Sequence, residues 1–146
     1  MYHYIESGLK YIWLINGFQQ QTLDGEIYTS IDDMHGLHRL IGQTVVDRHS
    51  PLKHDEVRFL RTEVNMSQKS LSTLLGVDVQ TVARWEKGQT DIPRTADVTL
   101  RALYLEFVNE TSKIGALLRM LADNEIAEER EKLVFAENEN VWQRAV

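Results

Sequence analysis

The sequence predicts an α+β protein: a small N-terminal β-sheet plus helix, an all-α domain of five helices, and a short β-like C-terminal tail. Three observations predict this class. Aromatic and β-branched runs separated by Asn-Gly and Asp-Gly turns occupy the first 31 residues. Apolar residues recur at helical spacing from about residue 52 to 107. The last residues return to two β-like runs around a polar turn.

The N-terminal part is expected to span residues 1–49, with strands in the runs YHYI, YIWLI and EIYTSI. Ser30 is a candidate helix cap, and Met34, Leu37, Ile41 and Val45 then recur at helical spacing. We expect the aromatic residues of this part to form the core of the sheet, with a subset facing a protein partner. They are Tyr2, Tyr4, Tyr11, Trp13 and Phe18.

The second part is expected to span residues 50–124, and Ser50-Pro51 introduces its first helix. Two further helices follow, and a fourth is expected to start at Pro93 and a fifth to lie around Ser112–Leu121. The fourth carries the apolar residues Val98, Leu100, Leu103, Leu105 and Phe107. Residues 125–146 are expected to form an acidic extension with a β-hairpin, whose strands pair with an open sheet edge of the same chain or of a dimer mate.

The stretch MSQKSLSTLLGVDVQTVARWEKG is typical of two short helices joined by a tight turn. Ser67 is expected to cap the first helix, and Gly76 ends it because a residue without Cβ permits the turn. Asp78 caps the second helix and Gly88 closes it. The shared core is expected to contain Leu71, Leu75, Val77, Val82 and Trp85.

The remaining side chains of the second helix share one outer stripe: Val79, Gln80, Ala83, Arg84 and Lys87. Glutamine can bond bidentately to adenine, and arginine can bond bidentately to guanine, in the major groove of DNA. Val79 can at most contact a thymine methyl. The stripe therefore predicts a helix that reads base edges.

The stretch Leu52–Phe107 resembles the Cro/CI-type (XRE) helix-turn-helix domain, through the blocks LRTEVNMSQKSLSTLLGV and QTVARWEKG. The resemblance implies that the second helix lies in the major groove and that dimers bind two half-sites. It makes Gln80 and Arg84 the expected base readers, while Gln68 contacts a phosphate and buttresses Gln80. The full set of expected DNA contacts is Ser67, Gln68, Val79, Gln80, Thr81, Arg84, Lys87, Thr90 and Arg94.

The resemblance also assigns structural roles and marks two departures. It implies an internal salt bridge between Arg61 and Glu86, and a core position for Trp85. Ser72 stands where the family generally has alanine, which weakens helix packing slightly. Leu74 stands at a usually polar position, which indicates an extra contact surface.

In the order of its parts, the chain is similar to MqsA-type antitoxins, whose N-terminal β domain binds a toxin and often zinc. The zinc-binding cysteine pairs are missing, since the chain contains no cysteine. His35 and His38 are the nearest metal-like pair, and a protein zinc site needs three or four ligands. We therefore expect no metal and no cofactor, and toxin binding through residues 1–49 remains one alternative.

Charge is distributed unevenly along the chain, whose formal net charge is -6. Residues 51–105 carry eight basic and seven acidic side chains, whereas the segments on either side are acidic. Screening limits phosphate attraction to about 8–10 Å, so an acidic total does not exclude DNA binding. The sequence lacks a glycine-rich phosphate loop, HExxH, GxSxG and a cysteine nucleophile, which argues against an enzyme.

The sequence thus predicts a dimeric, sequence-specific transcriptional regulator that represses through a palindromic operator and is of antitoxin type. No signal peptide and no apolar run of membrane-spanning length is present, so a cytoplasmic, nucleoid-associated protein is expected. The alternatives are a stand-alone regulator with a sensory or dimerisation N-terminal domain, and a protein-binding adaptor without DNA binding.

Overall fold

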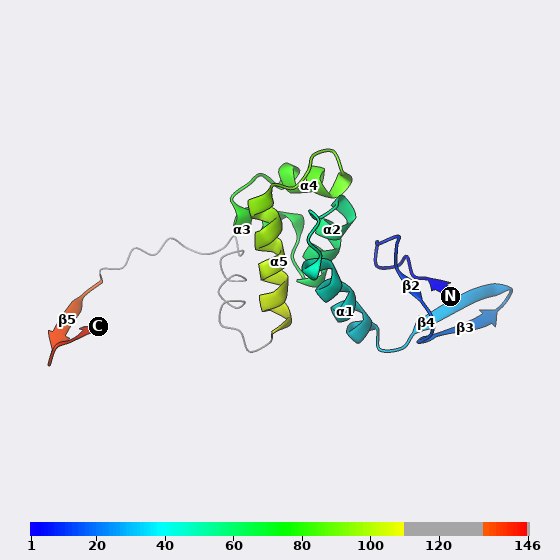
Figure 1. Ribbon diagram of the computed structural model, residues 1–146, viewed down its shortest axis with the longest axis horizontal. Helices are drawn as coiled ribbons and strands as arrows, with labels where there is room; N and C mark the ends of the chain where they lie inside the picture. The colour runs from blue at the N-terminus through cyan, green and yellow to red at the C-terminus, as the bar shows by residue number, and fades with distance from the viewer. Residues whose placement is uncertain (110–132, 146) are drawn as a thin grey trace.

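The computed structural model describes residues 1–109 and 133–145, and Figure 1 shows their arrangement. The α+β class predicted from the sequence is confirmed. The helix expected around Ser112–Leu121 lies outside the described residues. The helices are α1 (Met34–Asp47), α2 (His54–Glu63), α3 (Gln68–Leu75), α4 (Val79–Lys87) and α5 (Arg94–Val108). The strands are β1 (Tyr2–His3), β2 (Trp13–Leu14), β3 (Phe18–Leu23), β4 (Glu26–Ile31), β5 (Phe135–Asn138) and β6 (Val141–Arg144).

The strands form three separate antiparallel pairs, β1–β2, β3–β4 and β5–β6. The β3–β4 hairpin pairs every residue from Phe18 opposite Ile31 to Leu23 opposite Glu26. Its turn is Asp24-Gly25, and both residues have the positive φ that a tight hairpin turn requires. A ring contact between Tyr2 and Phe18, with centroids 5.2 Å apart, joins the first two pairs.

The N-terminal aromatic residues do not form the core of a sheet, so that expectation is wrong for most of them. Trp13 is 55% exposed and Tyr11 is 43% exposed, whereas Tyr4 is almost fully buried among the helices. Trp13 instead stacks on His3 with ring centroids 4.1 Å apart. Two-stranded pairs have no second layer that could cover these rings.

Helix α1 begins later than the sequence suggested, because Asp33 rather than Ser30 is its N-cap. The Asp33 carboxylate accepts a hydrogen bond from the backbone N–H of Gly36 at 3.1 Å, while Ser30 lies in β4. Ile41 and Val45 of the predicted apolar stripe are buried, as expected. None of the helices within the described ranges has the length and apolar character to cross a bilayer.

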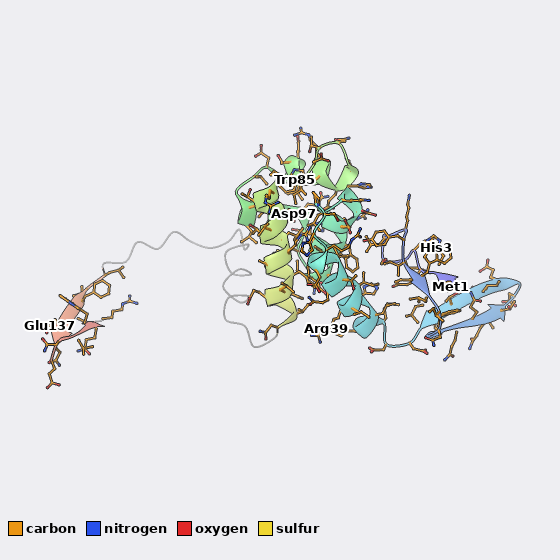
Figure 2. All side chains as sticks on the ribbon, viewed as in Figure 1. Met1, His3, Arg39, Trp85, Asp97 and Glu137 are labelled. Carbon is orange, nitrogen blue, oxygen red and sulfur yellow. The ribbon has the colours of Figure 1, made fainter. Side chains whose placement is uncertain are left out.

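Within residues 1–109, one hydrophobic core connects the five helices with the N-terminal segment. Tyr4 and Leu9 belong to the same buried cluster as residues of α1, α2 and α5. Figure 2 places Trp85 and Asp97 within the helical part of the molecule. In α5 the burial differs from the prediction, because Val98 and Leu105 are exposed while Ala96 and Tyr104 are buried.

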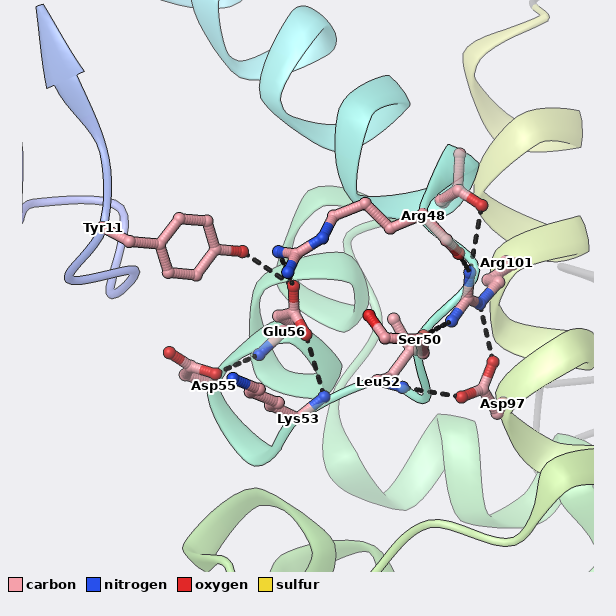
Figure 3. A network of polar contacts seen from close by, with 10 residues as sticks. Tyr11, Arg48, Ser50, Leu52, Lys53, Asp55, Glu56, Asp97 and Arg101 are labelled. Atoms are coloured by element: carbon pink, nitrogen blue, oxygen red, sulfur yellow. Dashed lines mark hydrogen bonds and ion pairs between the residues drawn. The ribbon is translucent and has the colours of Figure 1, made fainter.

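The chain between α1 and α2 is fixed onto α5 by Arg101 (Figure 3). The Arg101 guanidinium donates to the backbone carbonyls of Val46 at 3.1 Å and Ser50 at 2.7 Å, and also to that of Arg48. It also donates to Asp97 at 2.6 Å, and Asp97 accepts the backbone N–H of Leu52 at 2.8 Å. These charge-assisted bonds hold α1 and α2 in one arrangement.

Glu56 of α2 ties the N-terminal segment to the helices (Figure 3). Its buried carboxylate accepts hydrogen bonds from the Tyr11 hydroxyl at 2.7 Å, from Arg48 at 3.3 Å and from the backbone N–H of Lys53 at 2.9 Å. Burial, followed by the bond to Glu56, raises the pKa of Tyr11 well above its usual value. The folded state therefore favours the neutral phenol.

His38 of α1 makes a second contact between the N-terminal segment and the helices. One ring nitrogen lies 2.6 Å from the Tyr4 hydroxyl, and the other lies 2.7 Å from the Glu63 carboxylate of α2. The residue that the sequence marked as half of a metal-like pair thus joins the N-terminal segment to α1 and α2.

The Tyr11 contact predicts how stability depends on pH. Above pH 10 the unfolded chain releases the Tyr11 proton while the folded chain retains it, so the free energy of unfolding falls as pH rises. Tyr11→Phe should lower the free energy of unfolding by roughly 1 kcal/mol at pH 7. This loss is smaller than the contribution of a fully buried hydrogen bond to a charged group. The substitution should also make the alkaline fall shallower, measured by urea unfolding between pH 7 and 11.

A matched control for this prediction is Tyr28→Phe, since Tyr28 is exposed on the β3–β4 hairpin. It should leave both the stability at pH 7 and the alkaline slope close to wild type. Equal alkaline slopes for Tyr11→Phe and wild type would contradict the prediction.

The close packing of α1 on α5 at Gly42 leaves no room for a larger side chain. A Cβ at this position would overlap the hydroxyl and ring of Tyr104, which is buried against it. Gly42→Ala should therefore lower the free energy of unfolding by about 1–3 kcal/mol, despite the higher helix propensity of alanine. Thermal unfolding alongside the exposed neighbour Thr44→Ala checks this, and a stabilised Gly42→Ala protein would refute it.

Candidate nucleic-acid interface

The turn between α3 and α4 has the predicted geometry. Ser67 caps α3 by accepting the backbone N–H of Ser70 at 3.0 Å. Gly76 ends α3 with φ +69°, a conformation that glycine adopts without strain. The backbone N–H of Val77 then returns to the carbonyl of Ser72 at 3.0 Å. Two short helices are thereby joined at a fixed angle.

The start of α4 differs from the prediction in one respect. Asp78 occupies the N-cap position, but its carboxylate makes no capping hydrogen bond. The Asp78 backbone carbonyl still accepts from Thr81 N–H at 3.0 Å, so the helix begins at the predicted residue. Gly88 ends the helix with φ +74°, as expected.

The shared core of α3 and α4 is confirmed. Leu71 and Val82 are fully buried, and Trp85 is 3% exposed. Leu75 and Val77 are partly buried and pack against this cluster. Trp85 is therefore a core residue whose ring is not available to stack on a base.

The outer side of α4 presents the predicted stripe to solvent. Gln80, Arg84 and Lys87 are exposed, and Val79 is 42% exposed. Gln80 and Arg84 lie one helical turn apart and so share a face. Thr81 and Ala83 are half-buried at the edges of this stripe.

A buried ion pair fixes α4 against α2. Arg61 donates to both carboxylate oxygens of Glu86, at 2.6 and 2.9 Å, and the two side chains are 14% and 4% exposed. Arg61 also donates to the carbonyl of Met66 at 2.8 Å, next to the start of α3. The internal salt bridge predicted from the sequence is confirmed.

The other residues that the resemblance implies as DNA contacts lie near the stripe. Gln68 lies at the start of α3, and its amide donates to Glu86 at 3.1 Å rather than to Gln80. Thr90 and Arg94 are exposed, in the loop after α4 and at the first residue of α5. Their contacts with DNA, and that of Ser67, remain predictions.

The two departures from the resemblance have local explanations. The hydroxyl of Ser72 is buried and donates to the carbonyl of Lys69 at 2.7 Å, so it carries no unsatisfied polar group. Leu74 is partly buried against the core.

One neighbour of α4 was missed by the sequence analysis. The ring of His54, at the start of α2, lies against Gly88, since a Cβ at Gly88 would be 3.4 Å from it. The two residues are far apart in sequence, and no periodicity relates them. Only the packing of α2 on α4 brings His54 to the C-terminal end of α4.

The ion pair between Arg61 and Glu86 is expected to contribute to the free energy of unfolding. Glu86→Gln leaves the buried Arg61 guanidinium without its counter-charge, so the free energy of unfolding should fall by about 3 kcal/mol. Urea unfolding measures this, with Asp32→Asn as the matched exposed control. A loss below about 0.5 kcal/mol would show that the pair does not hold the two helices.

The comparisons with known proteins agree with this geometry. The family model described as helix-turn-helix matches residues 57–98, which run from α2 through α3 and α4 into α5. Neither the curated proteins nor the solved structures gave a match. Residues 57–98 are therefore similar to helix-turn-helix domains, in agreement with the two short helices and the tight turn that the structure shows.

Proposed function

We propose that this protein is a dimeric, sequence-specific repressor that reads a palindromic operator through α4. The observation that carries the proposal is the exposed Gln80–Arg84 stripe on a helix whose opposite side is buried. A helix held by a buried ion pair and a tryptophan loses little backbone freedom on binding. That rigidity favours base reading over a loose electrostatic contact.

In this proposal Gln80 and Arg84 bond to base edges, and Val79 contacts a thymine methyl. The neighbouring residues position the protein by contacting phosphates, which carry no sequence information. These residues are Ser67, Gln68, Thr81, Lys87, Thr90 and Arg94. Two chains would place two copies of α4 in successive major grooves.

An antitoxin role is the finer part of the proposal. The segment from Tyr11 to His38 contains no lysine or arginine but four carboxylates: Asp24, Glu26, Asp32 and Asp33. The same segment exposes apolar side chains, among them Ile15 at 82% and Ile27 at 68%. An acidic and apolar surface suits a basic protein partner, such as a toxin. A stand-alone cytoplasmic regulator is the second candidate, supported by the continuity of the N-terminal segment with the helical core.

Substitution of Gln80 or Arg84 is expected to weaken the discrimination between DNA sequences. Gln80→Ala and Arg84→Ala should each cost about 1–3 kcal/mol of discrimination between DNA from upstream of the gene and a scrambled duplex. Fluorescence anisotropy at several salt concentrations measures this difference. Light scattering of the complex tests the dimer.

The matched controls are Gln21→Ala and Arg39→Ala, which remove the same side-chain types from exposed positions outside the helix-turn-helix. Both controls should retain wild-type discrimination. A wild-type protein with no preference for any upstream duplex would overturn the proposal in favour of a protein-binding adaptor.

A further inference from the structure

The C-terminal β5–β6 hairpin exposes both of its aromatic side chains, since Phe135 is 59% exposed and Trp142 is 73% exposed. Among residues 1–109 and 133–145, its two strands pair with each other and with no further strand. A two-stranded hairpin on its own is marginally stable in water at best. A second surface that covers these rings would therefore stabilise the hairpin.

The register of the hairpin sorts its side chains into two different faces. Residues two apart along a strand, and residues directly opposite each other across the pair, point to the same side. One face, called the aromatic face from here on, carries Phe135, Glu137, Trp142 and Arg144. The other face carries only uncharged side chains, namely Ala136, Asn138, Val141 and Gln143.

On the aromatic face the rings and the charges lie on crossing diagonals. Arg144 stands opposite Phe135, and Trp142 stands opposite Glu137. The line from Phe135 to Trp142 therefore crosses the line from Glu137 to Arg144. Diagonal neighbours on one face are about 7–8 Å apart, which is within reach of aromatic side chains. The two rings thus form one apolar strip with a charge of opposite sign on either side.

This face is complementary to a second copy of itself. A two-fold axis along the Phe135–Trp142 diagonal places each ring on the same ring of the second copy and places Glu137 on Arg144. An axis along the other diagonal would set like charges together, and an axis along or across the strands would set a ring on a charge. A two-fold interface requires such self-complementarity. The strands of the two copies would cross at about 70°, close to the orthogonal class of sheet packing.

Other occupants fit the charges of this face less well. The segment from Tyr11 to His38, which contains the β3–β4 hairpin, has no lysine or arginine and so offers no counter-charge to Glu137. A basic protein partner would repel Arg144. A second copy satisfies both charges at once.

The area available suits a weak, reversible dimer. A fully covered aromatic side chain buries about 150–250 Å². With 59% of Phe135 and 73% of Trp142 now exposed, four rings would bury roughly 400–650 Å², about half of what the smallest stable interfaces bury. Exposed Leu133 adds to the same end of the hairpin, where the Ala145 N–H donates to the Val134 carbonyl at 2.9 Å.

We propose that two copies of this chain dimerise through the aromatic face, with the rings packed on their counterparts and Glu137 paired with Arg144 of the second copy. The contact lies outside residues 57–98, which match the helix-turn-helix family model. The inference rests on the dimeric state in the proposed function and gives that dimer its contact surface.

The test uses the full chain and the charge reversals Glu137→Arg and Arg144→Glu. Each reversal acts twice in a two-fold dimer, because it replaces two attractive pairs with two repulsive ones. Each variant alone should raise the dimer dissociation constant by about 10–100-fold, measured by analytical ultracentrifugation. The matched control Glu139→Arg makes the same change of charge in the turn between the strands, and it should keep the wild-type constant.

An equimolar mixture of the two variants separates a contact between chains from damage to the hairpin. In a mixed dimer each carboxylate of the Arg144→Glu chain meets a cation of the Glu137→Arg chain, so the mixture should dimerise about as tightly as wild type. Weakened single variants with a restored mixture support the proposal. Single variants that dimerise like wild type, a mixture that is not restored, or a monomeric wild type each overturn it.

Failure of the proposed function has a different signature. If the charge reversals behave as expected but wild type prefers no upstream duplex, sequence-specific repression is refuted and the hairpin contact stands. If wild type discriminates between duplexes but its dimer ignores both reversals, the hairpin contact is refuted and the repressor stands.

Discussion

The orientation of α4 in the candidate nucleic-acid interface depends on the buried ion pair between Arg61 and Glu86. Its bidentate geometry fixes the rotation of α4 about its own axis, because Glu86 lies on the inner face and Gln80 and Arg84 on the outer. The same guanidinium reaches the Met66 carbonyl, and Gln68 donates to the same carboxylate. Three helices thus share one charged contact. A rotation of α4 sufficient to turn Gln80 and Arg84 away from the outer side would leave buried charges unpaired, which is costly.

Acidity and DNA binding are compatible here because charges act locally. Glu86 of α4 is neutralised by Arg61 within the fold, whereas Arg84 and Lys87 of the same helix remain exposed. The excess of acidic charge lies in the two segments on either side of residues 51–105. Solvent and salt screen such charge over about one Debye length. The protein should therefore bind DNA weakly without a cognate sequence.

The helix-turn-helix could be predicted from the sequence because its signals are local. Gly76, Gly88 and the cap Ser67 lie at fixed spacings, and the apolar stripe of α4 follows from helical periodicity. The N-terminal segment was less predictable. Tyr4 and Tyr11 occur in β-like runs, but their positions are set by His38 and Glu56, far along the chain. The contact of His54 with Gly88 was not predictable, since only tertiary packing brings these two residues together.

The hydrogen bonds that hold the fold together join residues far apart in sequence, and this has a consequence for synthesis on the ribosome. The Tyr11–Glu56 bond spans 45 residues, the Arg101 bond to Val46 spans 55, and the Tyr104 bond to Arg39 spans 65. Contacts that close such long loops form late, because loop-closure entropy is lost before they contribute. The nascent N-terminal segment must therefore wait, with Tyr4 and Leu9 uncovered, until α1 and α2, which carry His38 and Glu56, have left the exit tunnel. A chain released before α2 would present these apolar side chains to chaperones and proteases.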